Sequence, residues 1–343
     1  MRRTETAGAA IGVAIVGAGW AGERHAAAYR LRPHLARVLA VVDSNAAVAA
    51  ARGHQWEATL ATTDLDAALN RADIEAVSIC VPHSLHIPIA LAALEAGKHV
   101  IIEQPFATST EDADALIRAA ARVRRLAMVA EGSRFDPVYL QMADMILSDE
   151  IGIPYLIRIA RDQHRHEMLR ARPWSLTDPA SGAMWGGGIH DIETVRMFTG
   201  GAAIQEVYAA ATRTNLPELE GDDTSVAVVR CEYGCVATLS ESYSAHTSAG
   251  LRVRAEVFGS HGAVCTDGTG AITITTQDGE RTVQVPSLDV YDVMIAHFLD
   301  CIRRSDEPAT AAYGMRPGLF ATLAAQTSMI VGAPVAPEPS SSF

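Results

Sequence analysis

The fold is decided by one stretch near the start of the chain, which reads Val13-Ala14-Ile15-Val16-Gly17-Ala18-Gly19-Trp20-Ala21-Gly22. Its apolar first half predicts a buried strand, and the residues that follow predict a helix. The glycines between them have the pattern Gly-x-Gly-x-x-Gly, which lets the backbone turn tightly and approach a pyrophosphate on the free amides of the helix start. The stretch therefore predicts a dinucleotide-binding Rossmann fold, with Gly17, Gly19, Trp20, Ala21 and Gly22 at the cofactor.

A second predicted strand ends at Asp43, about twenty residues further on, where a carboxylate can accept hydrogen bonds from the ribose hydroxyls of the adenosine. The same carboxylate repels the extra phosphate of NADP, and Ser44 and Asn45 carry no positive charge to offset it. The cofactor predicted here is therefore NAD rather than NADP. An alternative is that Asp43 only caps the helix that begins near Ala46.

The rest of the chain divides into two patterns. Up to about residue 130, short apolar runs alternate with amphipathic stretches, as parallel strands joined by crossover helices do. The strands predicted there are 12–16, 38–42, 76–81, 99–102 and 127–130, and the helices are 21–31, 65–70, 87–96 and 110–124. From about residue 153, alternating runs between Gly- and Asp-containing turns predict an antiparallel sheet with strands 155–160, 224–231, 236–242, 253–258 and 271–276. Helices are predicted at 183–198, 290–304 and 318–331.

We thus predict an α/β protein with an N-terminal Rossmann domain over residues 1–130. A C-terminal α+β domain over 131–333 carries a large, mostly antiparallel sheet, and 334–343 is a flexible tail rich in Pro and Ser. A length of 343 residues agrees with two domains.

Composition indicates which classes of binding partner to expect. A net charge of -12 argues against nucleic acid or an anionic membrane as the main partner, since both need a clustered basic surface, so a small-molecule ligand is expected. The apolar stretch 7–21 is too short and too glycine-rich to span a bilayer. Five scattered cysteines are typical of reduced thiols in a cytoplasmic protein.

Three further stretches resemble one family: Val81-Pro82-His83-Ser84-Leu85-His86, Ala96-Gly97-Lys98-His99-Val100-Ile101-Ile102-Glu103-Gln104-Pro105 and Trp185-Gly186-Gly187-Gly188-Ile189-His190-Asp191-Ile192-Glu193. They are similar to the glucose–fructose oxidoreductase / inositol dehydrogenase (Gfo/Idh/MocA) family. The resemblance implies NAD(P)-dependent transfer of a hydride to or from a hydroxyl or carbonyl carbon of a sugar, polyol or cyclic diol. It also implies homodimers or homotetramers that associate through the C-terminal sheet.

The resemblance places individual residues as well. It puts Val81, Pro82 and His86 near the nicotinamide end of the cofactor, together with Glu103. The next position, Gln104, stands where the family usually has a lysine that contacts the reacting hydroxyl. The position four residues before the retained His190 is Gly186, where the family has an aspartate.

These two departures change the expected proton transfer. Gln104 can hold a substrate oxygen, but it cannot take the proton that must leave when a hydroxyl is oxidised. The single lysine of the chain, Lys98, is expected to be a solvated charge at a helix end. His190 is therefore the predicted acid/base, with the glycines before it allowing close approach of a ligand. A structural histidine bound to a carbonyl is the alternative.

Secondary candidates follow in the stretch from Arg161. In an extended strand, His164 and His166 would point to one face and could contact substrate together with Arg161, although a solvated polar loop is an equal alternative. His164 is also a catalytic candidate, beside His190 and Gln104. Arg172 could bind a carboxylate and Trp174 could pack on a ring, unless that tryptophan is only packed in a crevice. The histidines match no spacing of metal ligands, so no metal is predicted.

Two other functions remain open at this point. Transient oxidation by NAD could make a neighbouring bond labile, which would give net elimination or hydrolysis. A protein that has lost its proton-transfer groups could instead be a non-catalytic NAD-binding regulator.

Overall fold

The computed structural model describes residues 9–247 and 250–337. Contacts between residues divide them into two compact units. Unit 1 comprises the described residues up to Phe106 together with Glu111–Ala130 and Asp289–Ala312. Unit 2 comprises Ala107–Thr110, Glu131–Leu288 and the described residues from Tyr313 onward.

Unit 1 contains a six-stranded sheet in which every neighbouring pair is parallel, in the order β3-β2-β1-β4-β5-β6. Its strands are β1 Ile11–Val16, β2 Ala36–Val42, β3 Leu60–Thr62, β4 Ala76–Ile79, β5 His99–Ile102 and β6 Ala127–Val129. All residues of β1 and β4 are buried, as expected for central parallel strands. This strand order is that of a Rossmann fold and confirms the predicted fold class. The short β3 was not predicted, because three residues carry too little pattern.

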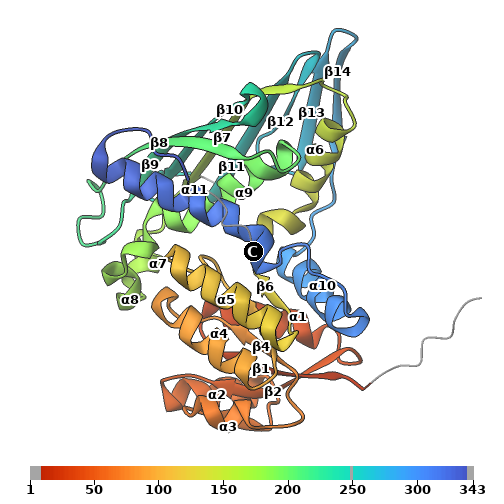
Figure 1. The fold of residues 1–343 in the computed structure, drawn as a ribbon, viewed down its shortest axis with the longest axis vertical. Coiled ribbons are helices and arrows are strands. Elements are labelled where there is room, and N and C mark those ends of the chain that lie inside the picture. The colour runs from red at the N-terminus through yellow and green to blue at the C-terminus, as the bar shows by residue number, and fades with distance from the viewer. Residues whose placement is uncertain (1–8, 248–249, 338–343) are drawn as a thin grey trace, which may run out of the picture. The chain divides into compact units, whose positions relative to one another are not determined.

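The helices of this unit follow the strands in alternation (Figure 1). They are α1 Trp20–Arg30, α2 Ala46–Gln55, α3 Leu65–Leu69, α4 His86–Glu95 and α5 Thr110–Val123. A further helix, α10 Val290–Arg304, packs against α1, and Arg24 and Arg32 form ion pairs with Asp289 and Asp292. The sequence prediction placed this segment in the C-terminal domain. It was wrong because the apolar face of α10 is buried against unit 1, which chain order does not reveal.

Unit 2 is built on an eight-stranded sheet in the order β14-β13-β12-β11-β7-β10-β9-β8. The strands are β7 Pro154–Gln163, β8 Ile204–Thr212, β9 Thr224–Cys231, β10 Val236–Ser242, β11 Leu251–Gly259, β12 Gly262–Thr266, β13 Ala271–Thr276 and β14 Gly279–Gln284. The pair β7 and β10 is parallel, and the other neighbouring pairs are antiparallel. The predicted large, mostly antiparallel sheet is confirmed.

One face of this sheet packs on helices (Figure 1). The helices of the unit are α6 Pro137–Leu147, α7 His166–Arg170, α8 Pro173–Thr177, α9 Ile189–Phe198 and α11 Ala312–Val331. Buried side chains of β7 and β10, such as Ile157 and Leu239, meet Met142 of α6, Phe198 of α9 and Ala325 of α11 in one hydrophobic core. The alternating burial along β9 and β10 follows from this one-sided cover.

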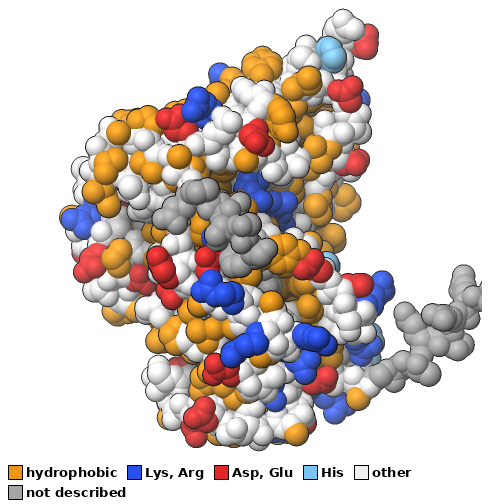
Figure 2. Space-filling model, in the orientation of Figure 1, with side chains coloured by type: hydrophobic (Ala, Val, Ile, Leu, Met, Phe, Trp, Pro, Cys, Tyr) orange, Lys and Arg blue, Asp and Glu red, His pale blue; other side chains and the backbone are white. Residues whose placement is uncertain are grey.

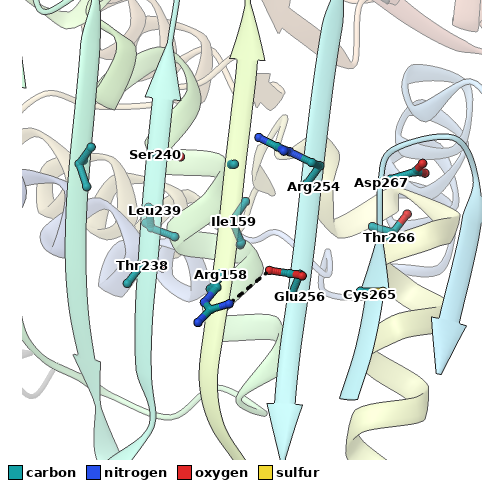
Figure 3. A pocket seen from close by; sticks show the side chains of 12 residues that line it. Arg158, Ile159, Thr238, Leu239, Ser240, Arg254, Glu256, Cys265, Thr266 and Asp267 are labelled. Atoms are coloured by element: carbon teal, nitrogen blue, oxygen red, sulfur yellow. Dashed lines mark ion pairs between the residues drawn. The ribbon is translucent and has the colours of Figure 1, made fainter. Parts of the chain in front are cut away.

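The opposite face of the sheet carries polar side chains and a shallow pocket of about 510 Å³ (Figure 3). Arg158 on β7 and Glu256 on β11 form an ion pair of 3.8 Å there. Exposed apolar side chains share this surface, among them Val226 and Val228 of β9. On the view in Figure 2, acidic and basic side chains are interspersed, and neither sign forms one continuous area.

The predicted flexible tail begins too early. Val335 forms a two-way backbone hydrogen-bonded bridge with Val207 of β8, both bonds being 2.9 Å long, so the chain is tied to the sheet beyond residue 334. Residues 338–343 of that prediction lie outside the described residues. Among the helices that the structure describes, none is long and apolar enough to cross a membrane.

Candidate active site

The glycine turn of unit 1 has the geometry that a dinucleotide needs. Gly17 has φ +91°, and a Cβ there would lie 2.2 Å from the carbonyl oxygen of Cys80. A Cβ on Gly22 would lie 2.1 Å from the carbonyl oxygen of Gly17, whereas one on Gly19 would meet nothing within 4 Å. Gly19 also precedes α1 without any side-chain cap, so open space adjoins the amides at the helix start, beside Trp20 and Ala21. This arrangement fits a pyrophosphate.

Asp43 ties the end of β2 to this turn. Its Oδ2 accepts the amide of Ala18 at 2.9 Å, and its Oδ1 accepts the amide of Asn45 at 2.9 Å. Each carboxylate oxygen keeps a lone pair for a ribose hydroxyl. The alternative that Asp43 only caps α2 is wrong, because the cap is Asn45, whose Oδ1 accepts the amides of Ala47 and Val48.

The segment after β4 holds its backbone through a buried histidine. His86 is fully buried, with Nδ1 2.8 Å from the carbonyl of Pro105 and Nε2 2.9 Å from the carbonyl of Val81. Burial lowers the pKa of His86 to about 4. The neutral ring carries one N–H and so donates to one of these two carbonyls, and a contact of His86 with the cofactor stays a prediction.

Glu103 is the last member of a chain of hydrogen-bonded side chains. His25 Nε2 lies 3.0 Å from Glu103 Oε1, and His25 Nδ1 lies 3.1 Å from Ser78 Oγ. The hydroxyl of Tyr29 is 2.9 Å from the same serine oxygen. Because the Glu103 carboxylate can only accept, the neutral His25 ring has its hydrogen on Nε2, and Nδ1 accepts from the Ser78 hydroxyl, which accepts from Tyr29. His25 Nε2–H is then the donor to Glu103.

The ring of Tyr291 on α10 stands at the other side of this chain. It lies edge-on to His25, with ring centres 5.5 Å apart, and edge-on to Trp20 at 5.9 Å. Burial and the Glu103 carboxylate raise the pKa of the Tyr291 hydroxyl. Tyr291 is therefore a neighbour of Glu103, although nearly two hundred positions separate them in sequence.

Gln104 follows Glu103 and is half-buried, with its Oε1 accepting the amide of Phe106 at 3.2 Å. The peptide bond from Gln104 to Pro105 is cis. Lys98 does not have the solvated charge that its place at a helix end predicts. It is buried, and Nζ donates to the carbonyls of Arg71 and Ile74 at 2.8 Å each, which leaves it tied to the backbone.

In unit 2, His190 is paired with a buried carboxylate. It lies on the first turn of α9, and its Nδ1 is 2.8 and 2.9 Å from the two oxygens of Glu131. Glu131 is completely buried and also accepts the amide and hydroxyl of Ser133. Burial alone would lower the pKa of His190, but the Glu131 carboxylate outweighs it, so the pKa lies above its ordinary value.

Nε2 of His190 has no hydrogen-bond partner among the described residues, and the side chain is 27% exposed. It is therefore the ring nitrogen left for a ligand. The alternative of a histidine bound to a carbonyl is not what the structure shows, because the ring is bound to a carboxylate.

The glycines before His190 serve the protein's own side chains. They form a π-helical turn, Met184–Gly188, next to β10. A Cβ on Gly186 would lie 2.0 Å from Tyr243 Oη, and one on Gly187 would lie 2.1 Å from Glu241 Oε2. The prediction that these glycines admit a ligand is thus wrong, since Tyr243 and Glu241 occupy that space.

Arg161 is an internal residue rather than a substrate contact. Its Nη2 donates to Asp191 Oδ1 at 2.5 Å, and its Nε lies 3.6 Å from Glu241 Oε2. Burial and the neighbouring Asp191 raise the pKa of Glu241 well above its ordinary value. The two carboxyl groups and one guanidinium therefore form a buried ionic cluster, which corrects the role expected for Arg161.

His164 and His166 do lie together, but not as alternate residues of one strand. β7 ends before them and His166 begins α7, yet their ring centres are 4.4 Å apart. His246 stacks on His164 at 4.3 Å. His166 Nε2 lies 2.9 Å from Ser244 Oγ.

The two other predicted substrate contacts, Arg172 and Trp174, lie at the start of the short helix α8. Arg172 is half-buried, and Trp174 is 38% exposed. In the described part of the chain, no group of His, Cys, Asp and Glu side chains is arranged to hold a metal ion.

The glycine turn and Asp43 define unit 1 as a dinucleotide-binding domain of the kind found in NAD-dependent oxidoreductases. Family models confirm this class: one described as "Oxidoreductase family, NAD-binding Rossmann fold" matches residues 11–131, and the "GFO/IDH/MocA C-terminal domain" matches 139–265. The chain belongs to the Gfo/Idh/MocA oxidoreductase family.

Individual relatives agree with this membership. The uncharacterized oxidoreductase YrbE of Bacillus subtilis is 28% identical over 337 residues, which cover 94% of this chain and 96% of that protein. The 4-carboxy-2-hydroxymuconate-6-semialdehyde dehydrogenase of Sphingobium sp. is 28% identical over 86% of this chain and 91% of its own length. The solved scyllo-inositol dehydrogenase of Lactobacillus casei with NAD(H) and scyllo-inositol has a TM-score of 0.82 at 23% identity, covering 96% of this chain and all of that one.

Sequence reasoning missed Glu131, His25 and Tyr291. Glu131 carried a signal, since a carboxylate directly after the apolar run of a predicted strand is costly to bury without a partner. His25 and Tyr291 lie within ordinary amphipathic helix patterns, which give no indication of a site.

Proposed function

We propose that the protein oxidises a hydroxyl group of a sugar, polyol or cyclic diol with NAD, or catalyses the reverse reduction, and that His190 is the acid/base. The observation that carries the proposal is the His190–Glu131 pair, which leaves Nε2 of a half-buried imidazole available. The scyllo-inositol bound by the Lactobacillus casei relative supports this substrate class.

Unit 1 holds the cofactor in this proposal. The glycine turn with Trp20 and Ala21 binds the pyrophosphate, and Asp43 binds the adenosine ribose and disfavours NADP. Val81, Pro82, Glu103 and Gln104 line the nicotinamide end. When bound, NAD supplies the acceptor for the hydride.

In this proposal, unit 2 accepts the proton of the substrate hydroxyl. As the C–H hydride leaves, the O–H proton passes to Nε2 of His190, and the alcohol becomes a carbonyl. The Glu131 carboxylate holds Nδ1–H and stabilises the imidazolium that forms. Gln104 can donate its amide hydrogen to the substrate oxygen but takes no proton. His164, His166, Arg172 and Trp174 are proposed substrate contacts.

The test is a panel of sugars, polyols and cyclic diols with purified full-length protein and NAD, followed through absorbance of the reduced nicotinamide. We expect NADH to accumulate with at least one class, and His190→Gln to slow this by about 10²-fold or more while NADH binding persists. Tight NAD binding with no turnover of any class would overturn the proposal. Release of a leaving group without net NADH would instead establish the elimination or hydrolysis alternative.

We also propose self-association through the open face of the eight-stranded sheet as a dimer or tetramer. Apolar side chains such as Val226, Val228 and Tyr208 are exposed there beside the pocket of Figure 3. Light scattering after size-exclusion chromatography measures the mass in solution. We expect the mass of a dimer or tetramer, and a smaller mass for Val228→Arg. A monomeric mass of the unchanged protein would reject the proposal. The cytoplasmic location and a domain boundary near residue 130 remain predictions.

A further inference from the structure

Three side chains that can carry a charge meet inside unit 2, next to His190. Arg161 of β7 and Glu241 of β10 are register partners on two parallel strands. Asp191 follows His190 in the first turn of α9, and its Oδ1 accepts a hydrogen bond of 2.5 Å from Arg161 Nη2. Nε of the same guanidinium lies 3.6 Å from Glu241 Oε2. Both acidic side chains are completely buried, so one cation faces two buried carboxyl groups.

Other titratable groups surround this cluster. They are Tyr139 of α6, Asp222 before β9, Tyr243 after β10 and His190 of α9. Burial raises the pKa of both tyrosines, so their phenols stay neutral at neutral pH. Asp222 adds no positive charge, and His190 has the Glu131 carboxylate as its partner. Of the described residues in this environment, Arg161 is thus the one cation that contacts both acids.

The charges of the cluster do not balance if both acids are ionised. Moving a charge out of water is costly unless an opposite charge is paired with it, and two neighbouring carboxylates also repel each other. In such a pair, one carboxyl group keeps its proton at a pH at which an isolated carboxyl group loses it. One proton on either Asp191 or Glu241 would balance the single charge of Arg161.

The geometry favours Glu241 as the acid that holds this proton. Asp191 Oδ1 receives a short hydrogen bond from the guanidinium, as a carboxylate does. Among the described residues, neither oxygen of Glu241 has a hydrogen-bond partner, and Asp191 Oδ2 has none either. An O–H of Glu241 can donate to Asp191 Oδ2, which gives both acids the missing bond. Burial, the charge of Asp191 and a hydrogen bond to it raise the pKa of Glu241 well above its ordinary value.

We infer that Glu241 is a protonated carboxylic acid at neutral pH, that it donates a hydrogen bond to Asp191 Oδ2, and that it thereby positions His190. The part that concerns His190 rests on the proposed function, and the part that concerns the proton does not. Asp191 is the residue after His190, so bonds that fix Asp191 also fix the backbone from which the imidazole reaches Glu131. A neutral Glu241 adds such a bond without competing with Asp191 for the guanidinium.

Infrared spectroscopy tests the proton without any turnover. A protonated carboxyl group has a carbonyl stretching band that a carboxylate lacks, so spectra of the full-length protein and of Glu241→Gln are compared at neutral pH. We expect the unchanged protein to show one such band that Glu241→Gln loses. Glu280→Gln, which changes an exposed glutamate of β14, is the matched control and should keep the band. The same spectrum for the unchanged protein and Glu241→Gln in this region would overturn the inference.

Denaturation by urea measures the same proton through the pH dependence of stability. An acid whose pKa is higher in the folded than in the unfolded state stabilises the protein at low pH, and this contribution is lost as pH rises. Between about pH 5 and 7, where an unfolded glutamate is ionised, the unfolding constant of the unchanged protein should rise about tenfold per pH unit relative to that of Glu241→Gln. A ratio that stays constant with pH would contradict a protonated Glu241.

Two variants test the positioning role. Glu241→Gln keeps an N–H donor for Asp191 and should retain kcat. Glu241→Leu has no donor, and we expect it to lower kcat by about tenfold or more with unchanged affinity for NADH, since a small displacement of the acid/base slows the chemical step. An unchanged kcat of Glu241→Leu, or the same loss in both variants, would reject the positioning role.

The outcomes separate this inference from the proposed function. If the infrared band and the pH-dependent ratio are found but no substrate is oxidised or reduced, the proposed function fails and the protonated pair stands. If substrate is turned over through His190 while the band is absent, the inference fails and the proposed function stands. The two measurements of the proton need only Glu241→Gln, so they remain decisive even where Glu241→Leu does not fold.

Discussion

Nδ1 of His190 lies within hydrogen-bond distance of both oxygens of Glu131, at 2.8 and 2.9 Å, although 59 positions separate the two residues in the chain. The carboxylate is completely buried, whereas the imidazole is partly exposed. A buried carboxylate favours the tautomer with hydrogen on Nδ1, which leaves the lone pair of Nε2 toward a ligand. This relationship is the basis for proposing His190 as the acid/base.

Replacing Glu131 should change the pH dependence of oxidation. Since the base must be unprotonated, kcat/KM rises as pH passes through the pKa of His190, which Glu131 raises. Glu131→Gln removes the attracting charge, so the pKa falls and the acid limb moves to lower pH. We expect kcat to fall by about 10²-fold or more, because the amide no longer enforces the tautomer. A pH–rate profile measures both effects. An acid limb that stays in place would contradict the assignment.

Removing the imidazole should separate chemistry from cofactor binding. His190→Gln should lower kcat by about 10²- to 10⁴-fold, the usual contribution of a general acid/base. NADH affinity, measured by fluorescence, should not change, because unit 1 contains the cofactor residues. His54→Gln, on the exposed side of α2, is the control for loss of a histidine as such. Equal kcat in the two variants would exclude His190 as the base.

Asp43 should set the preference between the two nicotinamide cofactors. Both of its oxygens accept backbone amides, so in Asp43→Asn one N–H must face the new amide nitrogen. We expect KM for NAD to rise about tenfold or more and the preference for NAD over NADP to shrink, since the repelling charge is gone. Steady-state kinetics with both cofactors tests this. Asp64→Asn, at the cap of α3, is a matched control. If Asp43→Asn prefers NAD over NADP as strongly as the unchanged protein does, Asp43 does not bind the adenosine ribose.

His25 should affect binding of the nicotinamide end of the cofactor only, because it acts through Glu103. His25→Gln breaks the chain from Tyr29 through Ser78 to Glu103. We expect about tenfold weaker NADH binding, with unchanged affinity for ADP-ribose, which lacks the nicotinamide. A double mutant with Glu103→Gln should lose little more than Glu103→Gln alone, because the two residues share one interaction. Equal losses for NADH and ADP-ribose would indicate a general structural defect instead.

Gly186 should tolerate a side chain only when Tyr243 loses its hydroxyl. The Cβ of Gly186→Ala would lie 2.0 Å from Tyr243 Oη but 3.3 Å from the ring carbon that bears it. We expect Gly186→Ala to lower the free energy of unfolding by about 1–3 kcal/mol. Tyr243→Phe should recover part of that loss in the double mutant. Urea denaturation measures the cycle, and strict additivity of the two changes would show that the contact does not exist.

The features that the sequence predicted are those set by neighbours along the chain. The glycine turn, the strands around it and the carboxylate at the end of β2 follow from local spacing, because strand period, turn conformation and helix start act over a few residues. The resemblance to the family adds Glu103 and His190, whose roles stay predictions.

Only the tertiary structure decided which groups these residues meet. Glu131 pairs with His190, Tyr291 reaches Glu103 from α10, and Lys98 is buried against two carbonyls. Arg161, a candidate for substrate, is neutralised inside the fold by Asp191 and Glu241, while Arg165 is left without a carboxylate among the described residues. Electrostatic and packing partners depend on distance in space, and residues far apart in sequence meet only after the sheets and helices have packed. The sequence alone therefore identified the cofactor fold and proposed a histidine, and the tertiary structure determined which carboxylate that histidine meets.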